Sequence, residues 1–350
     1  MKKPLRIALD AMGGDHGPAV VVPAVVQVLR EYPELVLILV GDAATLRAAL
    51  ARHRLQESDR IVIHHASEVV AMDEVPSKAL RSKKDSSMRV AINLVKAGQA
   101  DAMVSAGNTG ALMAIARFVL KTIPGIDRPA IMSRMPTMSG HTYMLDLGAN
   151  AGCTPEHLFQ FAVMGAAMVG AVHGVERPTV ALLNIGEEEL KGIESIKKAA
   201  LLLQKSKLNY IGFIEGNHIF DNRANVVVCD GFVGNVALKT SEGVAKLIAH
   251  FLREEFTRTW YAKLAAMAAY PVLKSLRNRM DPRLYNGASL LGLQGIVIKS
   301  HGGADSVAFA NAIKIGILEI KENIPGKIAD LVASSLWTAD KDHLLDISEG

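Results

Sequence analysis

Polar, glycine-rich segments recur along this sequence just before helical patterns, and their side chains could bind an anion or move a proton. The first segment, Asp10–Pro18, pairs Gly13 and Gly14 with the titratable Asp15 and His16. Adjacent glycines let the backbone approach a ligand closely. A structural turn capped by Asp15 would explain the glycines and the acid but leaves His16 without a role. We therefore predict that His16 is functional.

The segment Ser105–Gly110 combines hydroxyl, amide and glycine residues at the start of a helical pattern. Free N–H groups at a helix start, together with the side chains of Ser105, Asn108 and Thr109, favour an anion site that also contains Gly107. The same residue types cap helices that bind nothing, so that interpretation stays open. The segment is neither a Walker loop nor a Gly-x-Gly-x-x-Gly fingerprint. It predicts phosphate binding and gives no support to nucleotide binding.

Further polar candidates follow later strand-like runs. Together with Asp10 and Asp15 they are Asp146, Asn150, Asn184, Glu187, Lys191, Asp230, Asn235, Lys239 and His301. Lys191 and Lys239 can neutralise phosphate or a developing oxyanion, although an exposed helix lysine is an equally simple interpretation. Loops at strand ends often carry function, and we expect the segments of Asp146, Asn184 and Asp230 to gather at one rim of a sheet.

The elements that must position these residues alternate along the chain. Strand-like runs are Leu5–Leu9, Leu35–Val40, Arg60–Ile63, Ala102–Val104, Tyr143–Leu147, Thr179–Leu183, Tyr210–Ile214, Val226–Cys229 and Ile296–Lys299. Helical patterns lie between most of them, for example Ala19–Glu31, Asn108–Leu120, Glu156–Val172 and Ser306–Glu322. This alternation predicts an α/β fold with a mostly parallel sheet between two helical layers.

The segment Gly243–Arg283 differs, because two helical stretches follow each other without a strand and Pro271 is expected to interrupt them. Its apolar tip contains Leu264, Met267, Val272, Leu273 and Leu276. From Arg253 to Arg283 seven Lys or Arg stand against three acids, an excess of four that equals the excess of 39 over 35 for the whole chain. The segment predicts a protruding helical hairpin. Its apolar face can be buried in a dimer interface, or it can bind an anionic membrane surface, and both can hold together.

Composition excludes several classes of protein. Half of the 350 residues are apolar and 21% are charged, which is typical of a globular protein and not of a disordered one. The longest apolar run, Phe161–Val172, is shorter than the roughly 20 residues of a membrane-spanning helix. Cys153 and Cys229 are far apart, which argues against a disulfide framework and a zinc site and favours the cytosol. Without repeats or linkers, we expect one domain over residues 1–350 with the hairpin inserted at about 243–283.

Five motifs in order resemble the bacterial phosphate acyltransferase family: Asp10–Pro18, Ser105–Ala111, Asn184–Gly192, Asp230–Gly243 and Lys299–Asp305. The resemblance runs from Leu5 to about Lys321. It implies a Rossmann-like three-layer α/β/α fold related to phosphotransacetylases and isopropylmalate-type dehydrogenases, a homodimer, no metal or organic cofactor, and peripheral membrane association. His218 stands where the family has an acid.

The resemblance also implies an activity, the transfer of a fatty acyl group from acyl carrier protein to inorganic phosphate, giving acyl phosphate for phospholipid synthesis. It implies a cytoplasmic protein at the inner face of the cell membrane, near a downstream membrane glycerol-phosphate acyltransferase, with no nucleic-acid partner.

We hypothesise that Ser105, Asn108 and Thr109 hold phosphate while His16 orients or deprotonates it. Lys191 and Asn235 would stabilise the oxyanion. The helices of residues 243–280 would hold the acyl chain, and their basic residues would attract the acidic carrier protein.

Two other functions remain open from the sequence. A dehydrogenase on the same architecture is weakened by the missing dinucleotide fingerprint, and bound nicotinamide cofactor would revive it. A noncatalytic membrane-surface scaffold for acyl carrier protein explains the basic hairpin but not the polar strand ends.

Overall fold

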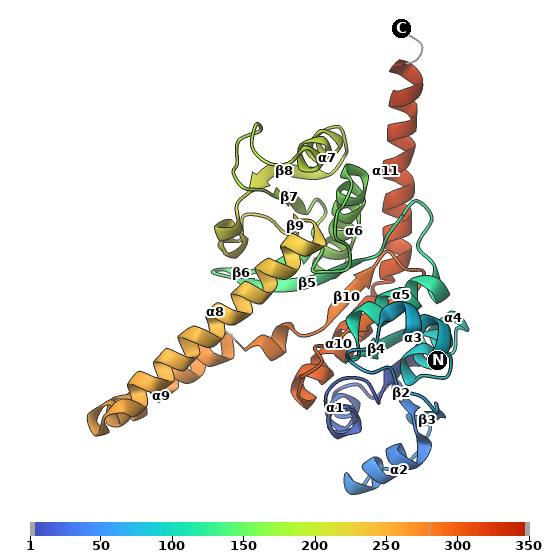
Figure 1. Cartoon of the computed structure of the whole chain (residues 1–350), viewed down its shortest axis with the longest axis vertical. Helices are drawn as coiled ribbons and strands as arrows, with labels where there is room; N and C mark the ends of the chain where they lie inside the picture. The colour runs from blue at the N-terminus through green and yellow to red at the C-terminus, as the bar shows by residue number, and fades with distance from the viewer. Residues whose placement is uncertain (1–3, 280, 347–350) are drawn as a thin grey trace.

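A single eleven-stranded sheet organises the chain in the computed structural model, which describes residues 4–279 and 281–346 (Figure 1). The strand order is β3-β2-β1-β4-β11-β10-β5-β6-β9-β7-β8. Seven neighbouring pairs are parallel and three are antiparallel. The predicted α/β fold with a mostly parallel sheet is confirmed.

The first half of the sheet is parallel and covered on both faces. It contains β1 (Leu5–Asp10), β2 (Leu35–Gly41), β3 (Ile61–His65), β4 (Ala102–Ser105) and β11 (Ile296–Lys299). Apolar side chains of α1 (Pro18–Glu31), α2 (Ala43–Arg52) and α10 (Ser306–Lys321) pack on one face. Those of α3 (Pro76–Ser82), α4 (Ser87–Lys96) and α5 (Thr109–Leu120) pack on the other. Burial on both faces explains why β1, β2, β4 and β11 are largely apolar, whereas the edge strand β3 is mostly exposed and ends in His64 and His65.

The second half is a separate parallel set, made of β6 (Gly140–Leu145), β9 (Val226–Val228), β7 (Thr179–Leu183) and β8 (Asn209–Ile214). One face is covered by α6 (Pro155–His173), α7 (Glu194–Gln204) and α11 (Ile324–Asp346). Two short 3₁₀ helices, Gly216–Asp221 and Pro282–Tyr285, complete the described elements. The core on the other face continues from the first half into the second, so one packed interior joins them.

Two strands that the sequence patterns did not predict, β5 (Ala130–Thr137) and β10 (Ala288–Leu291), join the halves. The steps β11–β10, β10–β5 and β5–β6 are all antiparallel. Three reversals leave the strands of the second half opposite in direction to those of the first. The polar segments after β6, β7 and β9 share one edge of the sheet, as predicted, because these three strands are parallel. The carboxyl ends of the first half lie at the other edge.

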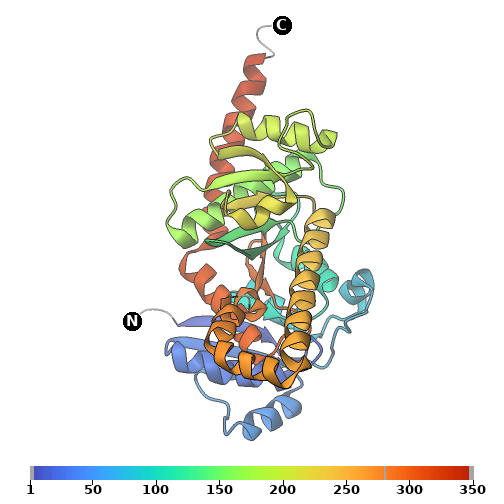
Figure 2. The ribbon, with the colours of Figure 1, turned by 90° about the vertical axis from the view of Figure 1, so that its left-hand side faces the viewer.

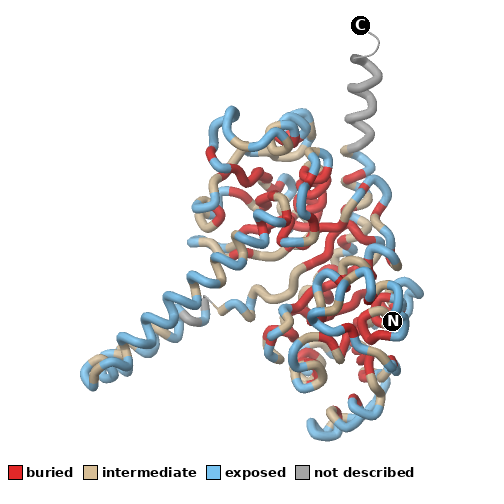
Figure 3. The backbone as a smooth tube through the Cα atoms, in the orientation of Figure 1, coloured by how far each residue is buried: buried red, intermediate tan, exposed pale blue. Residues whose placement is uncertain are grey.

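The helical hairpin protrudes from the body and is exposed along most of its length (Figures 1, 2 and 3). It consists of α8 (Gly231–Arg258) and α9 (Trp260–Arg279), and Met280 lies outside the described residues. The predicted break at Pro271 is wrong: the chain turns at Thr259, whose backbone is extended, and Pro271 lies inside α9. Because α8 begins at Gly231, Asn235 and Lys239 lie on a helix rather than on a loop.

Candidate active site

Asp10, the last residue of β1, is the centre of a buried hydrogen-bond cluster in the first half. Its carboxylate accepts hydrogen bonds from the hydroxyls of Ser87 and Ser105, both at 2.6 Å, and from the Gly13 N–H at 3.1 Å. Burial raises the pKa of Asp10, and these hydrogen bonds oppose the rise. The cluster fixes the ends of β1 and β4 against the start of α4. Asp10 thus has a positioning role, as expected of a supporting residue.

Ser105 closes the loop that follows β4. Its hydroxyl donates to Asp10 and accepts from the Gly107 N–H at 3.0 Å, and the residue is fully buried. A Cβ at Gly107 would lie 2.7 Å from Met88 Cε and 3.3 Å from Asp10 Oδ2, so a larger residue there would require the Met88 side chain to move. The two residues predicted to bind phosphate are used here to shape the loop.

Asn108 is the N-cap of α5 and also anchors a neighbouring loop. Its side-chain oxygen accepts from the Ala111 N–H at 3.0 Å. Its amide donates to the carbonyl oxygens of Met72, at 2.9 Å, and Glu74, at 3.0 Å. Among the described residues, no acceptor is recorded for the N–H groups of Thr109 and Gly110, which open the helix. These groups and the exposed Thr109 side chain can receive an anion.

Lys299 lies beside this loop and was not among the predicted site residues. It ends β11 next to Ser105 of β4, and only 9% of it is exposed. Its Nζ donates to the carbonyl oxygens of Ala106, at 3.4 Å, and Ser300. Burial lowers the pKa of Lys299 to about 8, whereas Asp10 and Asp15 act in the opposite direction. Its position at a strand end inside a predicted motif was the only available signal.

The loops after β1 and β11 lie side by side, because the Asp15 N–H donates to the Gly302 carbonyl at 3.0 Å. His301 Nδ1 accepts from the Gly303 N–H at 3.1 Å. Burial lowers the pKa of His301, as do Lys239 and Lys299. Asp15 and His16 are exposed. The structure thus brings the His16 and His301 loops to the edge where Lys299 and the start of α5 lie.

A second buried acid, Asp146, organises the loops of the other half. It accepts from the backbone N–H groups of Ile131 at 3.0 Å and Asn150 at 2.7 Å, and from the Asn150 amide at 2.8 Å. Burial raises the pKa of Asp146. Asp230 caps α8 and accepts from the N–H groups of Phe232 and Cys153, both at 2.8 Å. Like Asp10, these polar residues hold loops in place.

Asn235 is the exposed polar residue of this second cluster. A Cβ at Gly234, one residue before it, would lie 1.9 Å from the Asp146 carbonyl oxygen, so α8 contacts the Asp146 loop at a glycine. A Cβ at Gly148 would lie 3.3 Å from Asn235 Cβ. The close approach of helix and loop fixes Asn235 next to Gly148, with its amide free to face solvent or substrate.

The loop after β7 carries Lys191, whose ammonium is half-exposed and lies 2.8 Å from Glu188. That contact raises the pKa of Lys191. Asn184 is buried and donates its amide to the Lys191 carbonyl at 3.1 Å, which fixes the loop. Glu187 does not pair with Lys191. Its carboxylate accepts a hydrogen bond from the Arg223 guanidinium at 2.7 Å and lies 2.9 Å from His218 Nδ1.

Lys239 connects the two clusters. Its ammonium lies 2.9 Å from Glu242 on the same helix, and its charge lowers the pKa of both Lys299 and His301. α8 therefore starts at the strand ends of the second half, and its first turns bring Lys239 close enough for its charge to act on Lys299 and His301 before the helix runs out into the hairpin (Figure 1). Within the part of the chain that the structure describes, no group of three or more His, Cys, Asp or Glu could hold a metal ion.

Comparison with known proteins decides the family. Residues 5–326 match the family model described as "Fatty acid synthesis protein". A phosphate acyltransferase from Alkalilimnicola ehrlichii is 63% identical over 336 residues, which cover 96% of this chain and 98% of the relative. The chain belongs to the phosphate acyltransferase family. Another member, from Halorhodospira halophila, is 61% identical over 351 residues, with full coverage of both chains. The resemblance based on five motifs is confirmed.

Solved structures show how widely the fold of this phosphate acyltransferase family is shared. A phosphotransacetylase from Streptococcus pyogenes superposes with a TM-score of 0.63 at 18% identity, covering 92% of this chain and 95% of that one. A putative 4-hydroxythreonine-4-phosphate dehydrogenase from Salmonella typhimurium gives a TM-score of 0.54 at 14% identity, covering 91% and 99%. One architecture thus carries acyl transfer and dehydrogenation, so the fold alone does not select the reaction.

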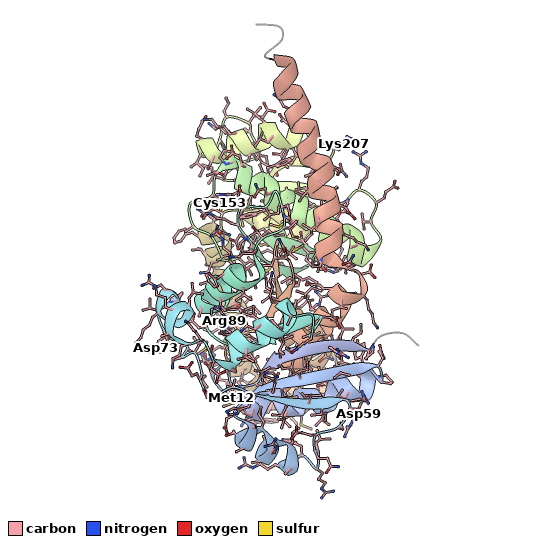
Figure 4. The ribbon with its side chains drawn as sticks, turned by 90° about the vertical axis from the view of Figure 1, so that its right-hand side faces the viewer. Met12, Asp59, Asp73, Arg89, Cys153 and Lys207 are labelled. Carbon is pink, nitrogen blue, oxygen red and sulfur yellow. The ribbon has the colours of Figure 1, made fainter. Side chains whose placement is uncertain are left out.

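Cys153 is the candidate nucleophile if this phosphate acyltransferase forms an acyl-enzyme. Burial, with Asp230 adding to it, raises the pKa of the Cys153 thiol to about 12, so the nucleophilic thiolate is scarce at neutral pH. Figure 4 shows Cys153 in the half of the molecule away from Met12 and the first loop. We expect Cys153→Ser to keep acyl phosphate formation within about threefold of wild type. Abolished activity, together with an acylated Cys153 in the intact mass of wild type, would contradict direct displacement.

Proposed function

We propose that this chain transfers a fatty acyl group from an acyl carrier protein thioester to inorganic phosphate, giving acyl phosphate for phospholipid synthesis. Membership of the phosphate acyltransferase family supports the reaction class. The observation that carries the site is the start of α5, which follows closely after Ala106, whose carbonyl accepts from the buried Lys299 ammonium. The open N–H groups of the helix start and this positive charge can together bind a phosphate dianion.

Phosphate binding is assigned to the Thr109 and Gly110 N–H groups, the Thr109 hydroxyl and the Lys299 charge. Ser105, Gly107 and Asn108 support this site without contacting phosphate, because their polar groups already form hydrogen bonds that hold the loop in shape. His16 lies on the adjoining loop and is exposed, so it can orient phosphate or accept its proton. Positioning the nucleophile supplies much of the acceleration, since phosphate is already nucleophilic at neutral pH.

The reaction then needs one addition and one departure. A phosphate oxygen bonds to the thioester carbonyl carbon, the carbonyl oxygen becomes an oxyanion, and the carbon–sulfur bond breaks as the oxyanion collapses. The thiolate of the carrier arm leaves and takes a proton from His16 or solvent. Lys191 and Asn235 stabilise the oxyanion, which requires Lys191 to leave Glu188, an exchange that an exposed ion pair allows at little cost.

Product analysis tests this proposal. Purified protein is mixed with acyl carrier protein thioester and ¹⁸O-labelled phosphate, and the products are identified by mass spectrometry. The expected product is acyl phosphate containing three ¹⁸O atoms in its terminal phosphoryl group and one in the bridge. Free fatty acid would indicate hydrolysis. Thioester left intact, with the carrier protein bound, would favour the noncatalytic scaffold.

From the hairpin we further propose that the chain forms a homodimer that associates with the inner face of the cell membrane. There it would lie close to the downstream glycerol-phosphate acyltransferase. Leu264, Met267 and Val272 are more than half exposed, which supports an apolar contact surface outside the body. Among the described residues no helix is both long and apolar enough to cross a membrane. Surface binding therefore needs the apolar tip and its basic flanks together.

The double variant Leu273→Glu/Leu276→Glu should no longer bind anionic vesicles. It should remain a dimer that is active on soluble substrate. Two carboxylates oppose both apolar insertion and attraction to anionic lipid. Vesicle sedimentation and size-exclusion chromatography give the comparison, with Leu201→Glu/Leu202→Glu on the exposed face of α7 as the matched control. If the hairpin variant still sediments with vesicles, or becomes a monomer, the dimer-interface interpretation replaces the membrane anchor.

A further inference from the structure

The helices α3, α4 and α5 carry an excess of positive charge that the proposed chemistry does not use. From Pro76 to Lys121 eight Lys or Arg stand against two acids, an excess of six. The whole chain has an excess of only four, from 39 against 35. Both α3 and α4 pack against α5, so these charges belong to one side of the first half. Such a concentration attracts an acidic partner.

Phe118 lies between two cations of this basic surface. It is 54% exposed, although other apolar residues of α5, such as Leu112 and Ile115, are buried. The Arg89 guanidinium carbon lies 5.2 Å from the ring centroid, and the Lys121 ammonium lies 4.9 Å from it. An exposed aromatic ring held between two cations combines the apolar and charged contacts that dominate protein interfaces.

The two cations are available to a partner. Among the described residues, neither Arg89 nor Lys121 forms an ion pair with an acid of this chain. In the hairpin, Arg258 lies 3.4 Å from Glu255, and among the described residues Lys263 and Lys274 form no ion pair. Unpaired cations gain more from an incoming carboxylate than cations already paired. The unpaired charges of Arg89 and Lys121 therefore suit an acidic partner.

The position of this surface fits the donor. Phe118 lies nine residues beyond Thr109 on the same helix, which is about 13 Å along its axis. A carrier protein bound at Phe118 would therefore sit near the start of α5, where its flexible thioester arm can reach phosphate. We infer that the surface formed by Arg89, Phe118 and Lys121 docks the acidic acyl carrier protein that delivers the acyl group. This inference rests on the proposed function and replaces the hairpin as the carrier-protein site.

Charge reversal tests the docking surface. In the full chain, Arg89→Glu/Lys121→Glu should raise the KM for the acyl carrier protein thioester at least about tenfold. The activity with acyl-pantetheine, a small thioester that lacks the protein, should stay within about twofold of wild type. Phe118→Ser, a change at an exposed position, should raise the same KM without altering the melting temperature. Lys205→Glu/Lys207→Glu is the matched control, and Figure 4 shows Lys207 far from Arg89.

Three results would overturn the docking site on α5. An unchanged KM for the carrier thioester in both variants overturns the docking site, and so does an equal loss with both thioesters. Loss of binding to anionic vesicles with an unchanged carrier KM assigns the surface to membrane and also overturns it. Calorimetric titration with carrier protein lacking an acyl group separates the two proposals. Binding by wild type that the charge-reversal variant loses supports docking, even where no acyl phosphate forms.

Discussion

Alanine at His16 or at Lys191 is expected to lower acyl phosphate formation about a hundredfold without unfolding the protein. Both side chains are on the surface, so neither change opens a cavity in the core. Lys191 loses one exposed contact with Glu188, which contributes little to stability. The losses should fall on the rate, because each residue is assigned to a charge or proton that develops during the reaction.

Matched variants separate this effect from a general surface effect. Lys198→Ala removes an exposed lysine that lies 3.6 Å from Glu194, a pairing like that of Lys191 with Glu188. His53→Ala removes an exposed histidine at the end of α2. Both controls should keep wild-type turnover, measured as acyl phosphate released per minute, with melting temperatures as the folding check. A folded His16→Ala or Lys191→Ala protein with near-wild-type turnover removes that residue from the mechanism.

The parallel parts of the fold could be predicted because their strands are apolar and are followed by helical patterns. The run Thr179–Leu183 and the run Ile296–Lys299 match β7 and β11 residue for residue. β5 and β10 were missed because β5 is broken by Ser133, Arg134 and Pro136, and β10 has only four residues. The antiparallel pairs formed by these two strands reverse the direction of the strands in the second half. That reversal could not be predicted, because it arises in the two strands with the weakest sequence pattern.

The candidate site shows a different limit. Sequence spacing identified Asp10, Ser105 and Asn108 as polar residues at strand ends, and the structure places them together. It could not distinguish residues that shape a loop from residues that face a ligand, because both uses favour the same side chains. Lys299 was missed for a related reason. A lysine at a strand end is usually exposed, and its burial follows from long-range neighbours that no local pattern contains.

Lys299→Met is expected to lower kcat/KM for phosphate about a hundredfold, because it removes the buried charge beside the start of α5. Stability should change little. Methionine removes the cost of burying an ammonium, worth at most about 3 kcal/mol for a pKa lowered from 10.5 to about 8. It also leaves the Ala106 and Ser300 carbonyls without their donor, a loss of similar size. A melting temperature near that of wild type would therefore accompany the lost activity.

The pH profile gives the sharper test. Lys299 is charged below about pH 8 and loses its proton above it, so kcat/KM for phosphate in wild type should fall as pH rises from 8 to 10. The folded protein disfavours the charged form of Lys299, whose pKa is lower there than in the unfolded chain. Below about pH 8 Lys299 is charged in both states, and the folded state is destabilised in full. Between pH 8 and 10.5 the folded state loses this proton first, and the destabilisation is relieved. Activity and the Lys299 contribution to stability thus move in opposite directions over that range. Lys299→Met should lose both slopes, and a variant that keeps the alkaline fall in kcat/KM would show that another group binds phosphate.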